Sequence, residues 1–105
     1  MNKIILDNQI LKLSFNLSTI KTKNQFLRKM QEFFEFPAYF GGGFDALNDC
    51  MRDLSWFCQD NLIIEFYHLE RIDNVQLREF IQDCLVCYQE YWQTFNHKNV
   101  SILIL

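Results

Sequence analysis

Residues 36–56 read Phe36-Pro-Ala-Tyr-Phe-Gly-Gly-Gly-Phe-Asp-Ala-Leu-Asn-Asp-Cys-Met-Arg-Asp-Leu-Ser-Trp56. An aromatic, glycine-rich loop runs directly into a segment whose apolar residues recur at helical spacing. All three glycines of the chain stand side by side in this loop, and the one proline lies near its start. Because glycine and proline interrupt helices, the loop separates two predicted helices and sets the order of the elements around it.

Short apolar runs predict strands at residues 3–6, 62–66 and 100–105, and we expect the first of them to be buried. Residues 8–21 are polar and mixed, so we expect a loop there. Strands that lack polar alternation and are separated by helices are typical of a parallel sheet covered by helices. The sequence therefore predicts an α/β fold with a three-stranded parallel sheet packed by three to four helices, in the order β-α-α-β-α-β.

Three helices are expected. The first follows Thr22-x-x-Gln25, which has the form of a capping box, and Pro37 should end it. The second covers residues 44–54. The third follows a similar pattern that starts at Asp73, and its apolar residues recur three or four apart for about five turns. With 105 residues and no internal repeat or linker, residues 1–105 form a single predicted domain.

The composition indicates a globular protein, since half of the residues are hydrophobic and 16% are aromatic. The net charge is −3 and the Lys and Arg residues are thinly spread, which argues against a nucleic-acid partner. No apolar run reaches the length of a membrane-spanning helix, and the N-terminus lacks the features of a signal peptide. We therefore expect a cytoplasmic protein that does not bind membranes.

The residues that could carry redox, metal or catalytic chemistry are few. Cysteines stand at positions 50, 58, 84 and 87, and in the cytoplasm we expect reduced thiols. The spacing of Cys84 and Cys87 is that of a redox pair, but two ordinary thiols on a helix are the simpler interpretation. His68 and His97 are isolated, and no set of zinc ligands is visible. We expect no metal, no cofactor and no catalytic residue, and hence a protein that is not an enzyme.

The predicted helix at residues 44–54 has two distinct sides. Successive residues are about 100° apart on a helix, which gathers the apolar ones on one side: Leu47, Cys50, Met51 and Leu54. The other side displays a polar row: Asp45, Asn48, Asp49, Arg52 and Asp53. Like charges one turn apart destabilise a helix by about 0.2–0.5 kcal/mol per pair, so this row suggests a binding role. A solvated exterior in which Arg52 pairs with a neighbouring aspartate is the alternative.

The loop ahead of this helix combines aromatic contact area with small residues. Tyr39 and Phe40 supply rigid rings, while Gly41, Gly42 and Gly43 would let a partner approach the backbone closely. Beside a row of carboxylates, such a loop has the composition of a protein–protein interface. The alternative is a turn whose aromatic residues belong to the core.

The segment resembles the signature of the barstar family. Members of that family carry a Pro-x-Tyr-Tyr/Phe-Gly loop, a helix that reads Leu-Asp-Ala-Leu-x-Asp-Cys, and a Trp shortly afterwards. The corresponding residues here are Pro37, Tyr39, Phe40 and Gly41, then Phe44-Asp-Ala-Leu-Asn-Asp-Cys50, and then Trp56. The Asp7-Asn-Gln-Ile10 segment and the apolar strands at 62–66 and 100–105 are also similar in order and spacing, so the resemblance spans nearly the whole chain.

This resemblance implies a three-stranded parallel sheet with packed helices, and an intracellular inhibitor of a barnase-like microbial ribonuclease. The loop and the helix would block a basic active site, where helix carboxylates take the place of RNA phosphates. Asp49 would be the central phosphate mimic and Asp45 a second anion. Tyr39 would pack near the catalytic histidine of the enzyme, and Gly41 would allow close backbone contact. The implied partner is one cognate ribonuclease, bound as a heterodimer.

The chain departs from the family pattern at several positions. Asn48 stands where the family has Trp, Gly43 replaces an Asn, and Asn61 replaces a Pro before the second strand. Arg52 places a cation on the acidic side of the helix, and Glu90 is a candidate for the acidic residue that the family carries on its last helix. These differences leave open an immunity protein or binding module of the same fold that is directed at a partner other than a ribonuclease.

The resemblance generates a kinetic prediction for Tyr39. An aromatic ring that packs against the partner forms its contacts after encounter, so Tyr39→Ala should raise the dissociation rate about tenfold or more and change the association rate little. Surface plasmon resonance with a ribonuclease partner measures both rates. An unchanged dissociation rate would remove Tyr39 from the contact surface.

Overall fold

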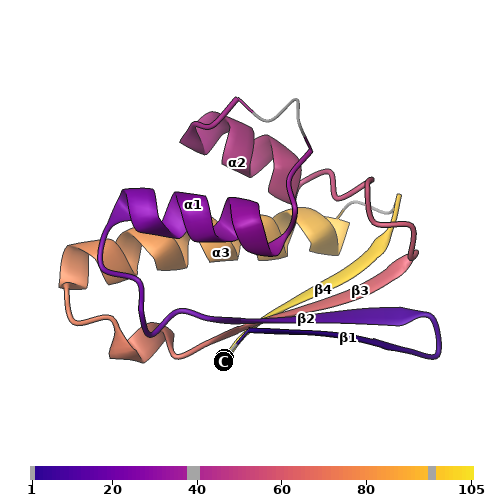
Figure 1. Cartoon of the computed structure of the whole chain (residues 1–105), viewed down its shortest axis with the longest axis horizontal. Coiled ribbons are helices and arrows are strands. Elements are labelled where there is room, and N and C mark those ends of the chain that lie inside the picture. Colours follow the sequence, from indigo (N-terminus) through magenta and orange to yellow (C-terminus); the bar gives the residue numbers. More distant parts are fainter. Residues whose placement is uncertain (1, 38–40, 95–96) are drawn as a thin grey trace.

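The computed structural model describes residues 2–37, 41–94 and 97–105. It has two layers, a four-stranded sheet and three α-helices that all lie on one face of it (Figure 1). Along the chain the elements follow the order β1, β2, α1, α2, β3, α3 and β4, with a short 3₁₀ helix (η1, Leu69–Arg71) ahead of α3. The α/β class is as predicted, whereas the sheet differs in detail.

The sheet consists of β1 (Lys3–Asp7), β2 (Ile10–Asn16), β3 (Asn61–Tyr67) and β4 (Asn99–Ile104), which lie side by side in that order. The pairs β2–β3 and β3–β4 are parallel, but β1 pairs with β2 in the antiparallel sense. The sheet is therefore mixed and four-stranded. The prediction of a three-stranded, all-parallel sheet was wrong in two details, since the sheet has one more strand and its β1–β2 pair is antiparallel.

The added strand, β2, lies within residues 8–21, so the predicted loop was wrong for residues 10–16 and holds for residues 17–21. Within it, β2 alternates buried and half-buried side chains, with Leu11, Leu13 and Phe15 pointing into the core. Asn8 and Gln9 both have positive φ angles, 49° and 67°. Two such residues form the tight hairpin turn whose twist matches the flanking strands. The turn folds β2 back along β1, and β2 then takes the place in the parallel sheet that was expected for residues 3–6.

Strand β1 is exposed, which contradicts the expectation of a buried first strand. All five of its residues are exposed, and Ile4, Ile5 and Leu6 are 52%, 49% and 59% accessible. The strand has a neighbour on one side only, because β2 separates it from the rest of the sheet. Its apolar residues therefore lie on an exposed edge strand and not in the core.

Helix α1 (Lys23–Phe33) begins as predicted, but its C-terminal end is not set by Pro37. The Thr22 hydroxyl accepts a hydrogen bond from the Gln25 backbone N–H at 3.0 Å. At the other end Glu35 adopts a left-handed conformation with φ of 52°, and the Phe36 N–H donates to the Gln31 carbonyl at 3.1 Å. This is the Schellman arrangement, so the helix ends before Pro37 can act on it.

The other two helices differ from the predictions at their ends. Helix α2 (Phe44–Met51) is shorter than the expected 44–54, since Arg52 caps it and Leu54 turns into the left-handed region with φ of 54°. Helix α3 (Val75–Thr94) is capped one residue later than expected. The side-chain oxygen of Asn74, and not that of Asp73, accepts from the Leu77 N–H at 3.0 Å. The last apolar residue of the predicted pattern, at position 95, lies outside the described residues.

One hydrophobic core fills the space between the sheet and the helices. Phe15 of β2 lies at its centre, with its ring centroid 6.4 Å from that of Phe34 and 5.9 Å from that of Phe66. All three are fully buried. Burial of each such ring stabilises the fold by about 1.5–3 kcal/mol. None of the helices in the described part of the chain is long and apolar enough to cross a membrane.

The sheet face opposite the helices carries one buried charge. Glu65, in the middle of β3, is 7% exposed. Its Oε1 accepts hydrogen bonds from Ser14 Oγ at 3.0 Å and Tyr67 OH at 2.9 Å, and lies 3.4 Å from Lys12 Nζ. Burial alone would raise the pKa of Glu65, but the two hydrogen bonds and the Lys12 ammonium outweigh it and hold the pKa below its ordinary value.

The stability of the protein should therefore depend on Glu65 in a pH-dependent way. A carboxyl group whose pKa is lowered on folding stabilises the fold above its unfolded pKa, near 4.5, and loses that contribution as the pH falls through the lower folded value. At pH 7, Glu65→Gln should reduce the free energy of unfolding by about 1–3 kcal/mol. Urea denaturation between pH 7 and pH 3 should show this difference shrinking; a constant difference would contradict the role of the charge.

Candidate functional site: the acidic helix and its loop

Helix α2 buries one side and displays the other. Leu47 and Met51 are fully buried and Cys50 is 4% exposed, and Leu54 just beyond the helix is fully buried. The predicted apolar side is therefore confirmed. Burial also raises the pKa of the Cys50 thiol, and the charges of Asp53 and Asp49 raise it further. This cysteine is a packing residue with a protonated thiol.

Two contacts at its ends hold α2 on the rest of the helical layer. Near its start, the Phe44 ring meets Phe80 of α3 edge to face, with centroids 5.2 Å apart. At its end, Trp92 Nε1 donates to the Met51 carbonyl at 2.8 Å, which satisfies one of the free carbonyls of the last turn. The helix is thus a preformed surface on a rigid support.

Trp56 anchors the start of the loop. Its Nε1 donates to the Phe34 carbonyl at 2.9 Å, and its ring meets Phe36 edge to face at 5.7 Å between centroids. The tryptophan of the sequence pattern therefore ties the segment after α2 to the end of α1. Both ends of the loop and helix unit are fixed to the core.

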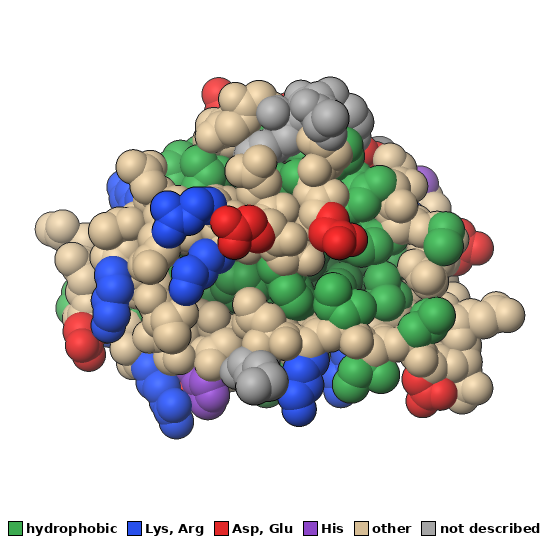
Figure 2. Space-filling view, in the orientation of Figure 1, with side chains coloured by type: hydrophobic (Ala, Val, Ile, Leu, Met, Phe, Trp, Pro, Cys, Tyr) green, Lys and Arg blue, Asp and Glu red, His purple; other side chains and the backbone are tan. Residues whose placement is uncertain are grey.

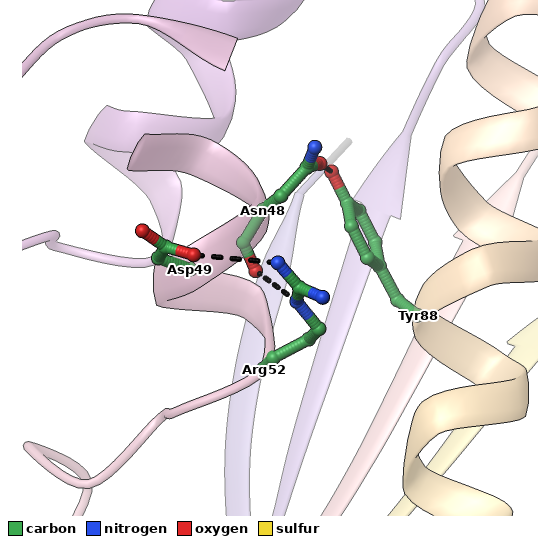
Figure 3. Close-up of polar contacts among 4 residues, drawn as sticks. All are labelled: Asn48, Asp49, Arg52 and Tyr88. Atoms are coloured by element: carbon green, nitrogen blue, oxygen red, sulfur yellow. Dashed lines mark hydrogen bonds and ion pairs between the residues drawn. The ribbon is translucent and has the colours of Figure 1, made fainter. Parts of the chain in front are cut away.

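Asn48 faces α3, and the expectation that it belongs to the outward row is only partly met. It is half-buried, and its Oδ1 accepts a hydrogen bond of 2.6 Å from the hydroxyl of Tyr88 on α3 (Figure 3). Tyr88 is fully buried, and burial raises the pKa of its phenol far above the ordinary value. The phenol therefore stays protonated and remains the donor.

Arg52 leans back over its own helix. Its Nε donates to the Asn48 carbonyl at 3.1 Å, and its Nη2 lies 3.3 Å from Asp49 Oδ1 (Figure 3). Its guanidinium carbon also lies 6.0 Å from the centre of the Tyr91 ring. The pairing of Arg52 with a neighbouring aspartate, which belonged to the alternative interpretation of this row, is thus present. The other Asp49 oxygen points away from the guanidinium, and this side chain is 78% exposed.

The remaining two aspartates of the row differ from each other. Asp45 is exposed in the first turn of α2, where a negative charge is stabilised by the helix dipole. Asp53 lies beyond the end of the helix and is half-buried, and its Oδ2 accepts from Ser55 Oγ at 3.0 Å. Asp45 and Asp49 therefore project from the helix, whereas Asp53 belongs to the turn that follows it.

The glycines of the loop are exposed and lie next to open space. Tyr39 and Phe40 fall outside the described residues, so their predicted contacts stay predictions. Among the described residues, a Cβ atom added at Gly41 or Gly43 would meet no other atom within 4 Å. Only Gly42, with φ of +85°, has a conformation that requires glycine. The described residues therefore leave room for a side chain at positions 41 and 43, and Gly43 is also the N-cap of α2.

Apart from Arg52, the C-cap of α2, few cations are in view around this helix on the face drawn in Figure 2. Figure 2 shows Lys and Arg side chains gathered toward one end and along the lower rim of this face, with none in view on the upper part over α2. Glu90 is exposed on α3, the helix that also supplies the side chains that hold α2. The sequence pattern placed Tyr88 and Trp92 on the apolar side of α3, but it gave no signal that their polar ends reach α2.

The cysteines and potential metal ligands do not form a second site within the described residues. All four cysteines are free; Cys84 is half-buried and Cys87 is exposed. Burial raises the pKa of Cys84, which opposes formation of a reactive thiolate. Within residues 2–37, 41–94 and 97–105, no three His, Cys, Asp or Glu side chains come together as metal ligands would.

The fold and this surface define a small α/β domain that presents a short acidic helix beside a glycine-rich loop. The chain belongs to the Barstar family: the family profile, described as Barstar (barnase inhibitor), matches residues 10–105. This finding confirms the family resemblance seen in the sequence. The family's description is that of an inhibitor and not of an enzyme. No curated protein matches the chain.

The hydrogen bond between Asn48 and Tyr88 should couple α2 to α3. Asn48→Ala leaves a buried phenol without its acceptor and should lower the free energy of unfolding by about 1–3 kcal/mol. Tyr88→Phe leaves a half-exposed amide that water can reach, so it should cost less. Denaturant unfolding of both single variants and the double variant gives the coupling energy. If the two losses in the free energy of unfolding simply add in the double variant, the two side chains act independently.

Proposed function

We propose that this protein inhibits a barnase-like ribonuclease inside the cell by inserting the loop 37–43 and helix α2 into the basic active site of the enzyme. The observation that carries the proposal is the placement of Asp45 and Asp49, two exposed carboxylates one turn apart on a helix whose other side is fixed in the core. The proposed contact surface consists of Tyr39, Phe40, Gly41, Gly42, Gly43, Asp45, Asn48, Asp49 and Arg52.

The chemistry of a ribonuclease pocket matches such a surface. A site that binds RNA phosphates is rich in Arg, Lys and His, which form charge-assisted hydrogen bonds to carboxylates, often in bidentate geometry. A helix that is already ordered avoids much of the entropy cost of fixing its carboxylates on binding. The contacts of Phe44 and Trp92 with neighbouring elements supply that order.

The ion pair between Asp49 and Arg52 does not prevent this role. The Arg52 side chain is 41% exposed and that of Asp49 is 78% exposed, and ion pairs at such exposure contribute about 0–1 kcal/mol. Close charge pairs across the barnase–barstar interface, which is this family's own example, have coupling energies of about 1.5–7 kcal/mol. Arg52 also contacts only Oδ1 (Figure 3), so a partner cation can bind Oδ2 without displacing it.

The loop supports the same proposal. Gly41 and Gly43 are exposed and meet no atom of the described residues, which is compatible with close approach of a partner to the backbone there. Asn48 has a different role from Asp45 and Asp49, since its hydrogen bond to Tyr88 holds α2 against α3. It contributes to the proposed surface by positioning Asp45 and Asp49.

Replacement of Asp49 tests the proposal. Asp49→Ala should weaken inhibition of RNA hydrolysis about a hundredfold or more, because it removes the central anion from a cationic pocket. Raising the salt concentration should slow association of the wild type, since the encounter is steered by opposite charges. The measurements are a steady-state RNA cleavage assay against barnase-like ribonucleases and circular dichroism to verify the fold.

Asp73→Ala provides the matched control, because Asp73 is an exposed aspartate ahead of α3 and outside the proposed surface. The Asp73→Ala variant should inhibit RNA hydrolysis as strongly as the wild type does. Equal potency of Asp49→Ala would refute phosphate mimicry. Binding to a partner without ribonuclease activity, lost in Asp49→Ala, would instead assign the surface to an immunity protein or binding module of the same fold.

A further inference from the structure

Strand β1 is an open edge of the sheet. It pairs with β2 on one side, and no strand of the described chain lies on its other side. Three of the exposed large hydrophobic residues of the protein, Ile4, Ile5 and Leu6, stand consecutively on this strand. Hydrophobic side chains reach the lower rim of the molecule in Figure 2, where β1 lies in Figure 1. An uncovered, apolar edge strand is a template for pairing with another strand.

The hairpin decides which backbone groups of β1 face outward. Asp7 and Ile10 flank the two-residue turn and are opposite each other, so they form the hydrogen-bonded pair that closes it. Hydrogen-bonded and non-hydrogen-bonded pairs alternate along an antiparallel ladder. Lys3 and Ile5 therefore direct their N–H and C=O groups toward β2, while Ile4 and Leu6 direct theirs outward.

A second copy of β1 satisfies these outward groups in one antiparallel register. If Ile5 faces Ile5 of the other copy across a two-fold axis, Ile4 faces Leu6 in a hydrogen-bonded pair, and the reverse pair is equivalent. The same register places Lys3 opposite Asp7 of the other copy, in a non-hydrogen-bonded pair where side chains approach closely. The strand is thus complementary to itself in both backbone groups and charge.

Other registers lack this match. A two-fold axis at Ile4 places Lys3 opposite Ile5, and an axis at Leu6 places Asp7 opposite Ile5, so each leaves both charges without a partner. Within its own chain Lys3 is opposite Ser14 and Asp7 is opposite Ile10, so neither charge has an opposite charge across the β1–β2 ladder. Charge complementarity therefore selects the register centred on Ile5.

We propose that β1 is a self-association surface, through which two copies of this chain join their sheets edge to edge into one continuous eight-stranded sheet. The contact between two five-residue strands is small, so the association belongs to the weak, transient class. Helix α2 lies on the far side of the helical layer from β1 (Figure 1), so the dimer leaves both acidic helices accessible. The inference is independent of the proposed inhibition.

Sedimentation equilibrium of the full chain over a range of concentrations tests the association. The wild type should shift from monomer toward dimer as concentration rises. Ile5→Glu should remain monomeric, because two carboxylates would stand directly opposite each other at the two-fold axis. Within one chain the new carboxylate lies opposite Lys12, so the variant should retain its fold, which circular dichroism verifies.

A charge swap tests the register. Lys3→Glu and Asp7→Lys should each raise the dimer dissociation constant about tenfold or more, because each places like charges opposite each other twice in the dimer. The double variant restores opposite pairs and should return to the wild-type value. Additive losses in the double variant would overturn the register.

Ser101→Lys is the control for the other edge of the sheet, since Ser101 is exposed on β4. It should associate as the wild type does. Loss of association in this variant alone would assign the contact to β4, and a wild type that stays monomeric at millimolar concentration would overturn the proposal.

Discussion

The burial of Leu47 and Met51 is the constraint on which the acidic surface depends. Because these two side chains are buried, the helical period places Asp45 and Asp49 on the outward side of α2. The hydrophobic contribution of the two buried residues, about 1.5–3 kcal/mol each, exceeds the repulsion between aspartates one turn apart, which is about 0.2–0.5 kcal/mol. The fold therefore sustains a row of like charges that an isolated helix of this length would not.

Polar contacts then fix the orientation of this partly buried helix. Hydrophobic burial has no direction, but the bonds from Tyr88 to Asn48 and from Trp92 to the Met51 carbonyl specify the rotation and the end of α2. Both donors come from α3, the longest helix, which itself packs on the sheet. The position of the carboxylates therefore depends on α3 and on its packing against the sheet.

The one-sided arrangement of helices separates two surfaces. Helix α2 lies on the outer side of the helical layer, whereas β1 and the open face of the sheet lie at the other end of the molecule (Figure 1). On that face the buried Glu65 is paired with Lys12 and accepts hydrogen bonds from two hydroxyl groups, which stabilises the sheet. A partner at α2 and a second copy at β1 would not compete for the same residues.

The family, the α/β class and the apolar side of α2 follow from the sequence alone, because local spacing and a matched pattern of residues suffice for each. It also contained the signal for β2, the alternation of Leu11, Leu13 and Phe15 with polar residues, which was outweighed by the polar composition of residues 8–21. The edge position of β1 and the contact of Asn48 with Tyr88 could be read only from the folded chain. Each of these depends on which residues from distant segments meet, and strand pairing and helix packing fix such meetings through the whole core.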